Sequence, residues 1–130
     1  MTTGDIVTAF YKSGKYIGEI TAIHPEHYTV KILAVLRHPA QGDLHHPNEA
    51  NVPFFHERKA LAFCEQANIP AKTVQPFRGE IPDYFETLRD AADKLKSKLQ
   101  QKDTPFARKS MAALESVQRE YELMYGSRWK

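Results

Sequence analysis

The sequence predicts a small protein that is mainly β, with α-helices at its carboxyl end. Residues 5–36 contain three runs rich in β-branched and aromatic residues, and short turn signals separate these runs. After Gly79 the apolar residues recur every three or four positions, which is typical of amphipathic helices. Of the 130 residues 42% are apolar, so the chain can bury a core without disulfides or metal.

Residues 5–11, 15–23 and 28–36 are the three predicted strands. The sequence KSG joins the first strand to the second, and a turn through Pro25 joins the second to the third. Connections this short leave no room for helical crossovers between parallel strands. The three strands are therefore expected to form an antiparallel meander.

Further β structure is indicated by the sequence NIPAKTVQPF at residues 68–77. An apolar-proline pair, a tight turn and a short last strand follow one another there, and this order resembles the segment that closes Src-homology-3-like (SH3-like) barrels. Together with the meander, it predicts a small SH3-like barrel over residues 1–80. A long loop at residues 37–53 is then an insertion between its third strand and its closing strands.

Residues 57–66 fit two kinds of structure. Ala60 and Cys64 lie at helical spacing, whereas Leu61 and Phe63 lie on one face of a strand. The barrel still needs a fourth strand at this point of the chain. This requirement favours the strand interpretation, and a helix is the alternative.

Two helices are predicted for residues 81–130. The first has Pro82 in its first turn and carries an apolar stripe made of Phe85, Leu88, Ala92, Leu95 and Leu99. After a short break, Thr104 caps the second helix, Pro105 begins it and Gly126 ends it. Two striped helices joined in this way are expected to form an antiparallel helical hairpin that packs on the barrel.

The loop and the residues after it hold four of the six histidines and raise the question of a metal site. Imidazole and carboxylate groups are suitable ligands for zinc or iron. The spacing of these residues fits no established metal-binding signature, and the neighbouring His45 and His46 would diverge on an extended backbone. We therefore expect no metal and no cofactor; the alternative is a site formed by His38, Asp43, His45 and His56.

Catalytic patterns are weak in this chain. Cys64 and His56 could form a nucleophilic pair only if the fold brought them together, and no glycine turn lies beside the cysteine to supply an oxyanion site. The six glycines are scattered singly, so no phosphate-binding loop is indicated. The sequence predicts a binding protein that is not an enzyme, with a metal-dependent enzyme that uses the histidines as a less favoured alternative.

A partner surface is predicted on the long loop and beside the first turn. Aromatic side chains in such places are of the type enriched at binding hot spots. We expect at least one of Phe54 and Phe55 to close the barrel core instead. The candidate surface residues are Tyr11, Tyr16, His38, Asp43, His45, Phe54 and Phe55.

The charge distribution and the absence of targeting signals bear on the partner and on the cellular location of the protein. Residues 1–58 have a net charge of −1 and residues 59–130 of +3, a weak imbalance for a protein that binds nucleic acid. The amino terminus lacks the pattern of a signal peptide, and no run of residues has the length and apolarity of a membrane span. LAFC at residues 61–64 faintly resembles a lipoprotein cleavage box, but Phe63 occupies the position of the small residue. We expect a cytoplasmic protein with Cys64 as an unmodified thiol.

Four stretches of this sequence together carry a family resemblance: HPAQGDLHHP, VPFFHERKALAF, NIPAKTVQPF and GEIPDY. With them the chain resembles the kinase-associated protein B (KapB) family of spore-forming bacilli. The resemblance implies an SH3-like barrel with appended helices. It also implies a role in supporting a membrane sensor histidine kinase that feeds the sporulation phosphorelay. The kinase is then the protein partner, and contact with the membrane would be indirect, through that kinase.

The family has been called a lipoprotein, whereas no export signal precedes Cys64 here. No catalytic or ligand-binding residues are carried over from it. A second reading of the function is an RNA- or ribosome-associated binding module, because SH3-like barrels also occur in translation proteins and residues 94–102 read KLKSKLQQK. Such a basic run is more often a solvated helix face, and Asp90 and Asp93 dilute its charge.

Overall fold

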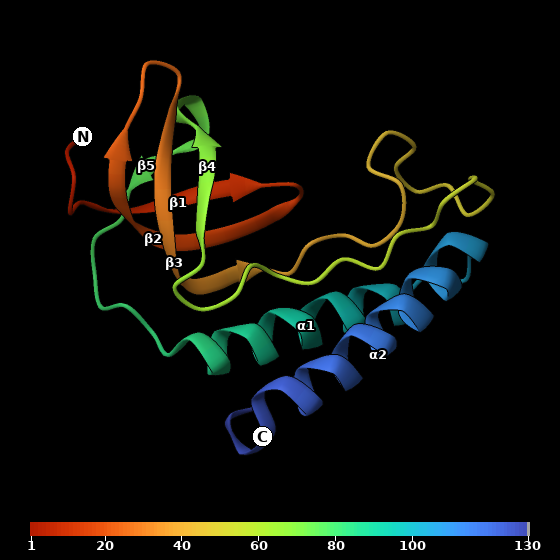
Figure 1. Cartoon of the computed structure of the whole chain (residues 1–130). Helices are drawn as coiled ribbons and strands as arrows, with labels where there is room; N and C mark the ends of the chain where they lie inside the picture. Colours follow the sequence, from red (N-terminus) through yellow and green to blue (C-terminus); the bar gives the residue numbers. More distant parts are fainter. Residues whose placement is uncertain (130) are drawn as a thin grey trace.

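The computed structural model describes residues 1–129 (Figure 1). Five strands come first: β1 (Ile6–Tyr11), β2 (Gly14–Ile23), β3 (His27–Arg37), β4 (Gln66–Pro70) and β5 (Gln75–Pro76). A single 3₁₀ turn, η1 (Ala71–Thr73), joins the last two strands. The helices α1 (Tyr84–Gln100) and α2 (Pro105–Tyr125) follow, and a second 3₁₀ turn, η2 (Gly126–Arg128), comes after them.

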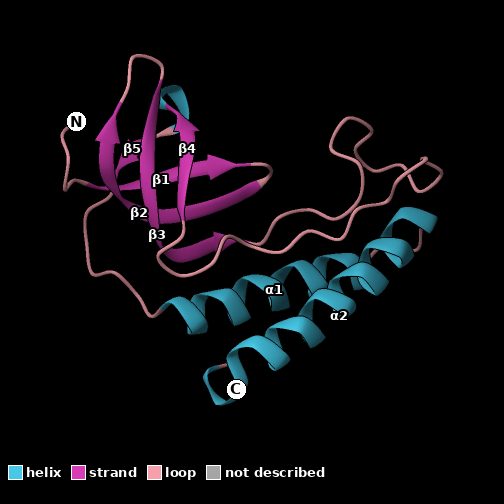
Figure 2. Cartoon of the chain, in the orientation of Figure 1, coloured by secondary structure: helices cyan, strands magenta, loops and turns pink. Residues whose placement is uncertain are grey.

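The strands form one antiparallel sheet in the order β4-β3-β2-β1-β5. Figure 2 shows that the sheet is strongly curved and that both helices lie on one side of it. Three register shifts between β2 and β3 contribute to the curvature, because bulges increase strand twist. Gly18 lies at one of them, where a Cβ atom would come within 2.6 Å of the Lys31 carbonyl oxygen. The predicted fold class, mainly β with a carboxyl-terminal helical hairpin, is confirmed.

The prediction for residues 57–66 was wrong in both of its forms. Residues 57–65 are neither strand nor helix, and the fourth strand begins only at Gln66. The reason is that side chains accept from four backbone amides of this segment in place of a neighbouring strand, while the Cys64 amide near its end donates to the Ile32 carbonyl of β3. The acceptors for Arg58, Ala60, Leu61 and Ala62 are, in this order, the side chains of Gln41, Tyr121, Tyr16 and Glu65.

Both helices begin at side-chain caps. The Asp83 carboxylate accepts from the Glu86 amide at 3.0 Å, so α1 starts after Asp83, and Pro82 precedes the helix instead of lying in its first turn as predicted. The limits of α2 are as predicted, because Thr104 caps it through the Ala107 amide and Gly126 ends it. A side-chain acceptor at the N-cap satisfies an amide that has no partner inside the helix.

The sheet and the helices share one apolar core. Its buried members from the sheet include Val7, Ile20, Val30, Ile32, Val35 and Ile69, and those from the helices include Leu88, Ala91, Ala92, Val117 and Tyr121. A smaller cluster of Leu99, Ala107 and Leu114 holds the two helices together near their connection. The helix α1 is also tied to the edge of the core by a hydrogen bond of 3.0 Å from the Val35 amide to the Thr87 hydroxyl.

Candidate binding surface

The segment between β3 and β4, residues 38–65, lies beside the helices. Figure 1 shows that it leaves β3, runs along the helical hairpin to the end where α1 and α2 are joined, and returns to β4. Contacts with α2 fix its path: Phe55 packs on Phe106, and the Lys109 ammonium donates to the Ala50 carbonyl at 2.9 Å. We call residues 38–65 the connecting segment.

His38 anchors the start of the connecting segment in the protein interior. Its side chain is buried, Nδ1 lies 3.0 Å from the Pro39 carbonyl oxygen and Nε2 lies 2.8 Å from the Tyr121 hydroxyl. Because a carbonyl only accepts, Nδ1 carries the proton and Nε2 accepts from Tyr121. Tyr121 in turn accepts from the Ala60 amide at 2.8 Å, so one chain of hydrogen bonds joins both ends of the segment to α2.

Burial keeps His38 neutral. It lowers the pKa of the imidazole to about 4, and the hydrogen bond to Pro39 opposes this shift only in part. Burial also raises the pKa of Tyr121, which therefore stays protonated and can donate to Nε2. His38 consequently has a structural place in the core and presents no nitrogen to solvent.

Gln41 and Arg58 join the two halves of the connecting segment. The buried Gln41 amide donates to the carbonyls of Pro39 and Arg58, and it accepts from the Arg58 backbone amide at 2.8 Å. The Arg58 guanidinium donates to the Gly42 carbonyl at 2.9 Å. These bonds replace the ladder that a pair of strands would form, and they order a long segment that has no regular secondary structure.

Asp43 and His45 lie farther along, in an exposed turn. The Asp43 carboxylate accepts from the His45 amide at 2.9 Å and lies 3.1 Å from Nδ1 of His46. These interactions lower the pKa of Asp43, and the backbone bond to His45 has the largest effect. Asp43 thus fixes the shape of the turn, which is a common use of a carboxylate in a loop.

The alternative metal ligands do not converge. His38 uses both ring nitrogens inside the core, Asp43 is engaged by His45 and His46, and the exposed His56 stacks on Phe54. Within residues 1–129 no three histidine, cysteine or acidic side chains are placed to hold a metal ion. That this protein holds no metal stays a prediction.

The four aromatic candidates lie in different environments. Tyr16 is in the core with 1% exposure, and its hydroxyl accepts from the Leu61 amide. Tyr11 is half-buried beside the first turn, and Phe55 is half-buried against Phe106. Phe54 is 71% exposed and is the one with most of its ring in solvent.

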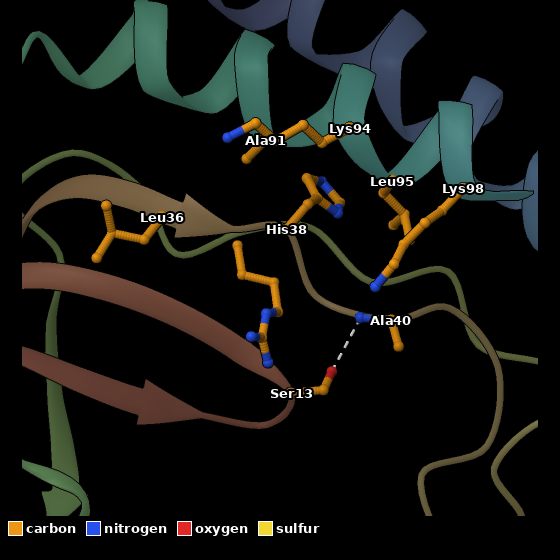
Figure 3. Close-up of a pocket in the computed structure, with 9 residues that line it drawn as sticks. Ser13, Leu36, His38, Ala40, Ala91, Lys94, Leu95 and Lys98 are labelled. Atoms are coloured by element: carbon orange, nitrogen blue, oxygen red, sulfur yellow. Dashed lines mark hydrogen bonds between the residues drawn. The ribbon is translucent and has the colours of Figure 1, made fainter.

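A groove lies between the β1–β2 turn, the end of β3 and α1 (Figure 3). It has a volume of about 580 Å³. Apolar side chains form its floor and walls: Leu36 and Ala40 from β3 and the residues after it, and Ala91 and Leu95 from α1. Its cations are Arg37, Lys94 and Lys98, and Figure 3 shows Lys98 pointing from α1 toward Ala40.

The β1–β2 turn forms one wall of this groove. Its two central residues, Lys12 and Ser13, have φ angles of 44° and 70°, and Tyr11 pairs directly with Gly14. The Ser13 hydroxyl accepts from the Ala40 amide at 2.9 Å and so links the turn to the connecting segment. Sequence reasoning identified the turn from KSG, but the bond between residues 27 positions apart could not be found from local pattern.

Comparison with known proteins identifies the family. The model of the family described as kinase-associated protein B matches residues 11–122, which include β2–β5, α1 and nearly all of α2. The chain belongs to the kinase-associated protein B family. The resemblance inferred from the sequence is therefore confirmed.

Two members of the kinase-associated protein B family are similar over almost their whole length. A Bacillus subtilis (strain 168) protein named kinase-associated lipoprotein B is 57% identical over 119 residues, which are 92% of this chain and 93% of that protein. The X-ray crystal structure of kinase-associated protein B from Bacillus cereus has 42% sequence identity and a TM-score of 0.80, and the match covers 94% of this chain and 98% of that one.

The name of the Bacillus subtilis relative includes the word lipoprotein. Across residues 1–129, none of the helices combines the length and the apolarity of a membrane span. Cys64, the cysteine of this chain, is exposed in the turn that precedes β4.

Proposed function

We propose that this protein is a non-enzymatic regulator that binds a sporulation sensor histidine kinase and supports its activity in feeding the phosphorelay. One observation carries the proposal: the 57% identity to a relative named kinase-associated lipoprotein B, over 92% of this chain. The finer points, that the kinase is a sensor histidine kinase of sporulation and that contact is direct, come from the resemblance of the sequence to the family. We place the protein in the cytoplasm, at the membrane through its partner.

The environments of the polar side chains support a binding role. His38, Gln41 and Tyr121, which are buried and could otherwise serve chemistry, are used to hold the connecting segment on α2. The groove beside α1 instead offers apolar surface and cations that face solvent. We therefore propose the groove as the contact surface for the kinase. Of the surface residues predicted from the sequence, Tyr11, Asp43, His45, Phe54 and Phe55 stay candidates for accessory contacts.

A pull-down from sporulating cells with the purified full chain tests this function. The expected result is recovery of a sensor histidine kinase in the presence and in the absence of RNase. Recovery of ribosomal material that is lost on RNase treatment would instead support the RNA-associated reading and overturn the proposal. Leu123→Ser is the comparison variant, because Leu123 is an exposed apolar side chain on α2 that lies outside the groove and outside the candidate contacts. It is expected to recover the kinase as well as the wild type does.

A further inference from the structure

We propose that the groove between the β1–β2 turn, the end of β3 and α1 binds an acidic segment of a protein partner that inserts large apolar side chains between its carboxylates. This inference deepens the proposed function, because it states which chemistry the kinase would present. It rests on the proposed function only for the identity of the partner. Three features of the described residues lead to it.

The first feature is an excess of unpaired positive charge. Arg37, Lys94 and Lys98 line the groove, and no carboxylate is among its lining residues. Two further cations lie beside the groove: Lys12, next to Ser13 in the β1–β2 turn, and Lys15 on β2, which pairs with Arg37 of β3. None of these five cations belongs to an ion pair within residues 1–129. They remain available to acidic groups of a partner.

Two acidic residues of α1, Asp90 and Asp93, reduce this charge but do not cancel the three cations of the groove. Asp90 and Asp93 lie on the adjoining face of the helix, together with the outer sides of Lys94 and Lys98. Asp90 and Lys94 are four residues apart, a spacing that favours an ion pair, yet no such pair forms between them. The groove itself therefore stays positive, and an acidic partner would be attracted to it over a distance of about 10 Å at 0.1 M salt.

The second feature is the apolar floor. Leu36 is 38% exposed at the end of β3, and Leu95 is half-buried on α1 across from it. Apolar surface that is exposed and concave favours insertion of apolar side chains, because removing apolar surface from water is favourable. A ligand that is purely ionic would leave this surface in contact with water.

The third feature is a well-defined turn at the wall. Lys12 and Ser13 both have positive φ angles, which a type I′ turn requires when two residues join antiparallel strands. Gly14 follows at the next position, where a Cβ atom would come within 2.6 Å of the Tyr16 hydroxyl oxygen. The hydrogen bond from the Ala40 amide to the Ser13 hydroxyl holds the turn against the connecting segment, so this wall of the groove is formed before a partner binds.

A protein segment fits these features better than single-stranded nucleic acid does. Binding of single strands depends on aromatic rings on which bases stack, and no Phe, Tyr or Trp side chain is among the residues that line the groove, while its His38 is buried. Phe10 lies next to it on β1, but Lys15 and Arg37 already cover its ring at 5.2 and 5.6 Å. Carboxylates and apolar side chains on one segment match both the cations and the floor.

The test uses the full-length protein and the kinase recovered in the pull-down, with affinity measured on purified proteins. Lys94→Glu/Lys98→Glu is expected to weaken binding by about tenfold or more, because charge reversal replaces attraction by repulsion. Leu36→Ser is expected to weaken it by roughly fivefold through lost apolar contact. Arg78→Glu/Arg119→Glu makes the same change of charge on exposed residues outside the groove and is expected to bind as the wild type does.

The salt dependence of the affinity separates the electrostatic contribution to binding from the apolar contribution. Raising the salt concentration should weaken binding of the wild type and of Leu36→Ser, and it should affect Lys94→Glu/Lys98→Glu much less. Circular dichroism confirms that each variant is folded before its affinity is compared. If the kinase binds the charge-reversed variant within twofold of the wild type, the inference is wrong even though the proposed function stands.

Photo-crosslinking tests the inference when the partner is not the kinase. A photoreactive benzoylphenylalanine at position 36 of the full chain, introduced in sporulating cells, is expected to capture a peptide with an excess of Asp and Glu and with large apolar residues. A captured peptide of this kind from another protein would support the inference and contradict the proposed function. Capture of a basic or neutral peptide or of RNA, or no capture at all, would overturn the inference.

Discussion

The hydroxyl of Tyr121 joins three parts of the chain that are far apart in sequence. The hydroxyl accepts from the Ala60 amide and donates to Nε2 of His38, and the ring of Tyr121 packs on Trp129. All of these groups are buried or lie against buried neighbours, so hydrogen bonds among them are not exchanged for bonds to water. Buried polar groups are costly to leave without a partner, and this makes Tyr121 a residue whose oxygen atom has a large effect on stability.

The change Tyr121→Phe should lower the free energy of unfolding by about 1 to 3 kcal/mol, because it leaves the Ala60 amide and Nε2 of His38 buried without partners. Urea denaturation measures this difference. Tyr28→Phe is the matched control, since Tyr28 is half-buried and its hydroxyl has no hydrogen-bond partner within residues 1–129. Equal effects of the two changes would show that the Tyr121 hydroxyl does not stabilise the fold.

Stability should also depend on pH through His38. Its pKa is about 4 in the folded protein and 6.5 in the unfolded chain, so the unfolded chain binds more protons between these values. The stabilising effect of neutral His38 is complete above pH 6.5 and is lost as the pH falls toward 4. Between pH 6.5 and 5 the loss should be about 2 kcal/mol. In His38→Phe the same interval should show a smaller loss, and an unchanged pH profile in that variant would contradict the assignment.

At the scale of elements, the local sequence pattern predicts most strands and helices correctly. It fails for a segment whose conformation depends on residues far away in the sequence. The alternation of β1–β3 and the caps at Thr104 and Gly126 depend on neighbours in sequence, and their positions were predicted to within one or two residues. Residues 57–65 take their conformation from Tyr16, Gln41 and Tyr121, which are 17 to 61 residues away. Such bonds leave no periodic pattern in a single sequence. The sequence alone therefore could not show that this segment is neither strand nor helix.

The residues of the candidate surface were also difficult to predict from the sequence. Packing of the helical hairpin on the barrel was expected from the apolar stripe of α1. The residues that line the groove could not be brought together from the sequence, since Ser13, Arg37 and Lys98 meet only in the folded chain. The aromatic residues chosen for the surface instead include Tyr16, which the alternation of β2 places in the core.

The turn at Cys64 leads into β4 and is hydrogen-bonded to β3, and this position bears on lipid attachment. The Cys64 amide donates to the Ile32 carbonyl at 2.7 Å, and β4 pairs with β3 directly after the turn. Lipoprotein processing before this cysteine would separate β1–β3 from β4, β5 and the helices. We therefore predict that Cys64 is an unmodified thiol in an uncut chain.

Intact-mass measurement on protein from its native cells, together with alkylation of the exposed thiol, checks the state of Cys64. The expected result is one polypeptide that contains residues on both sides of Cys64 and takes up one alkyl group. A diacylglycerol-modified fragment that begins at Cys64 would contradict both this prediction and the fold as the functional form. Cys64→Ser supplies the control that takes up no alkyl group.

At the scale of the whole molecule, the question is whether the barrel and the helical hairpin behave as one unit. We propose the boundary between them at residues 80 and 81, where an exposed stretch leads from β5 to α1. The apolar core crosses this boundary, because Leu88 on α1 is fully buried in the same cluster as Val7, Ile32 and Val35 of the sheet. A shared core of this kind favours cooperative unfolding of both parts.

Leu88→Ala is therefore expected to lower the free energy of unfolding by about 2 to 5 kcal/mol, as a large-to-small change in a core. Leu123→Ala, on the 87% exposed side chain of α2, is the matched control and should change it by less than about 0.5 kcal/mol. Leu95→Asp should also be strongly destabilising, because Leu95 packs against the cluster that joins the two helices.

Two probes decide whether these losses belong to one unit. Fluorescence of Trp129, which packs on α2 residue Tyr121, reports the hairpin, and hydrogen exchange of the Ile32 and Val30 amides reports the sheet. In the wild type and in Leu88→Ala both probes should give the same free energy of unfolding, since neither part keeps a complete core when the other is lost. If Leu88→Ala weakens the hairpin signal while the protection of the sheet amides stays as in the wild type, the helices are a separate arm. The proposed groove would then have one mobile wall, and its width would be set by the partner instead of by Ser13.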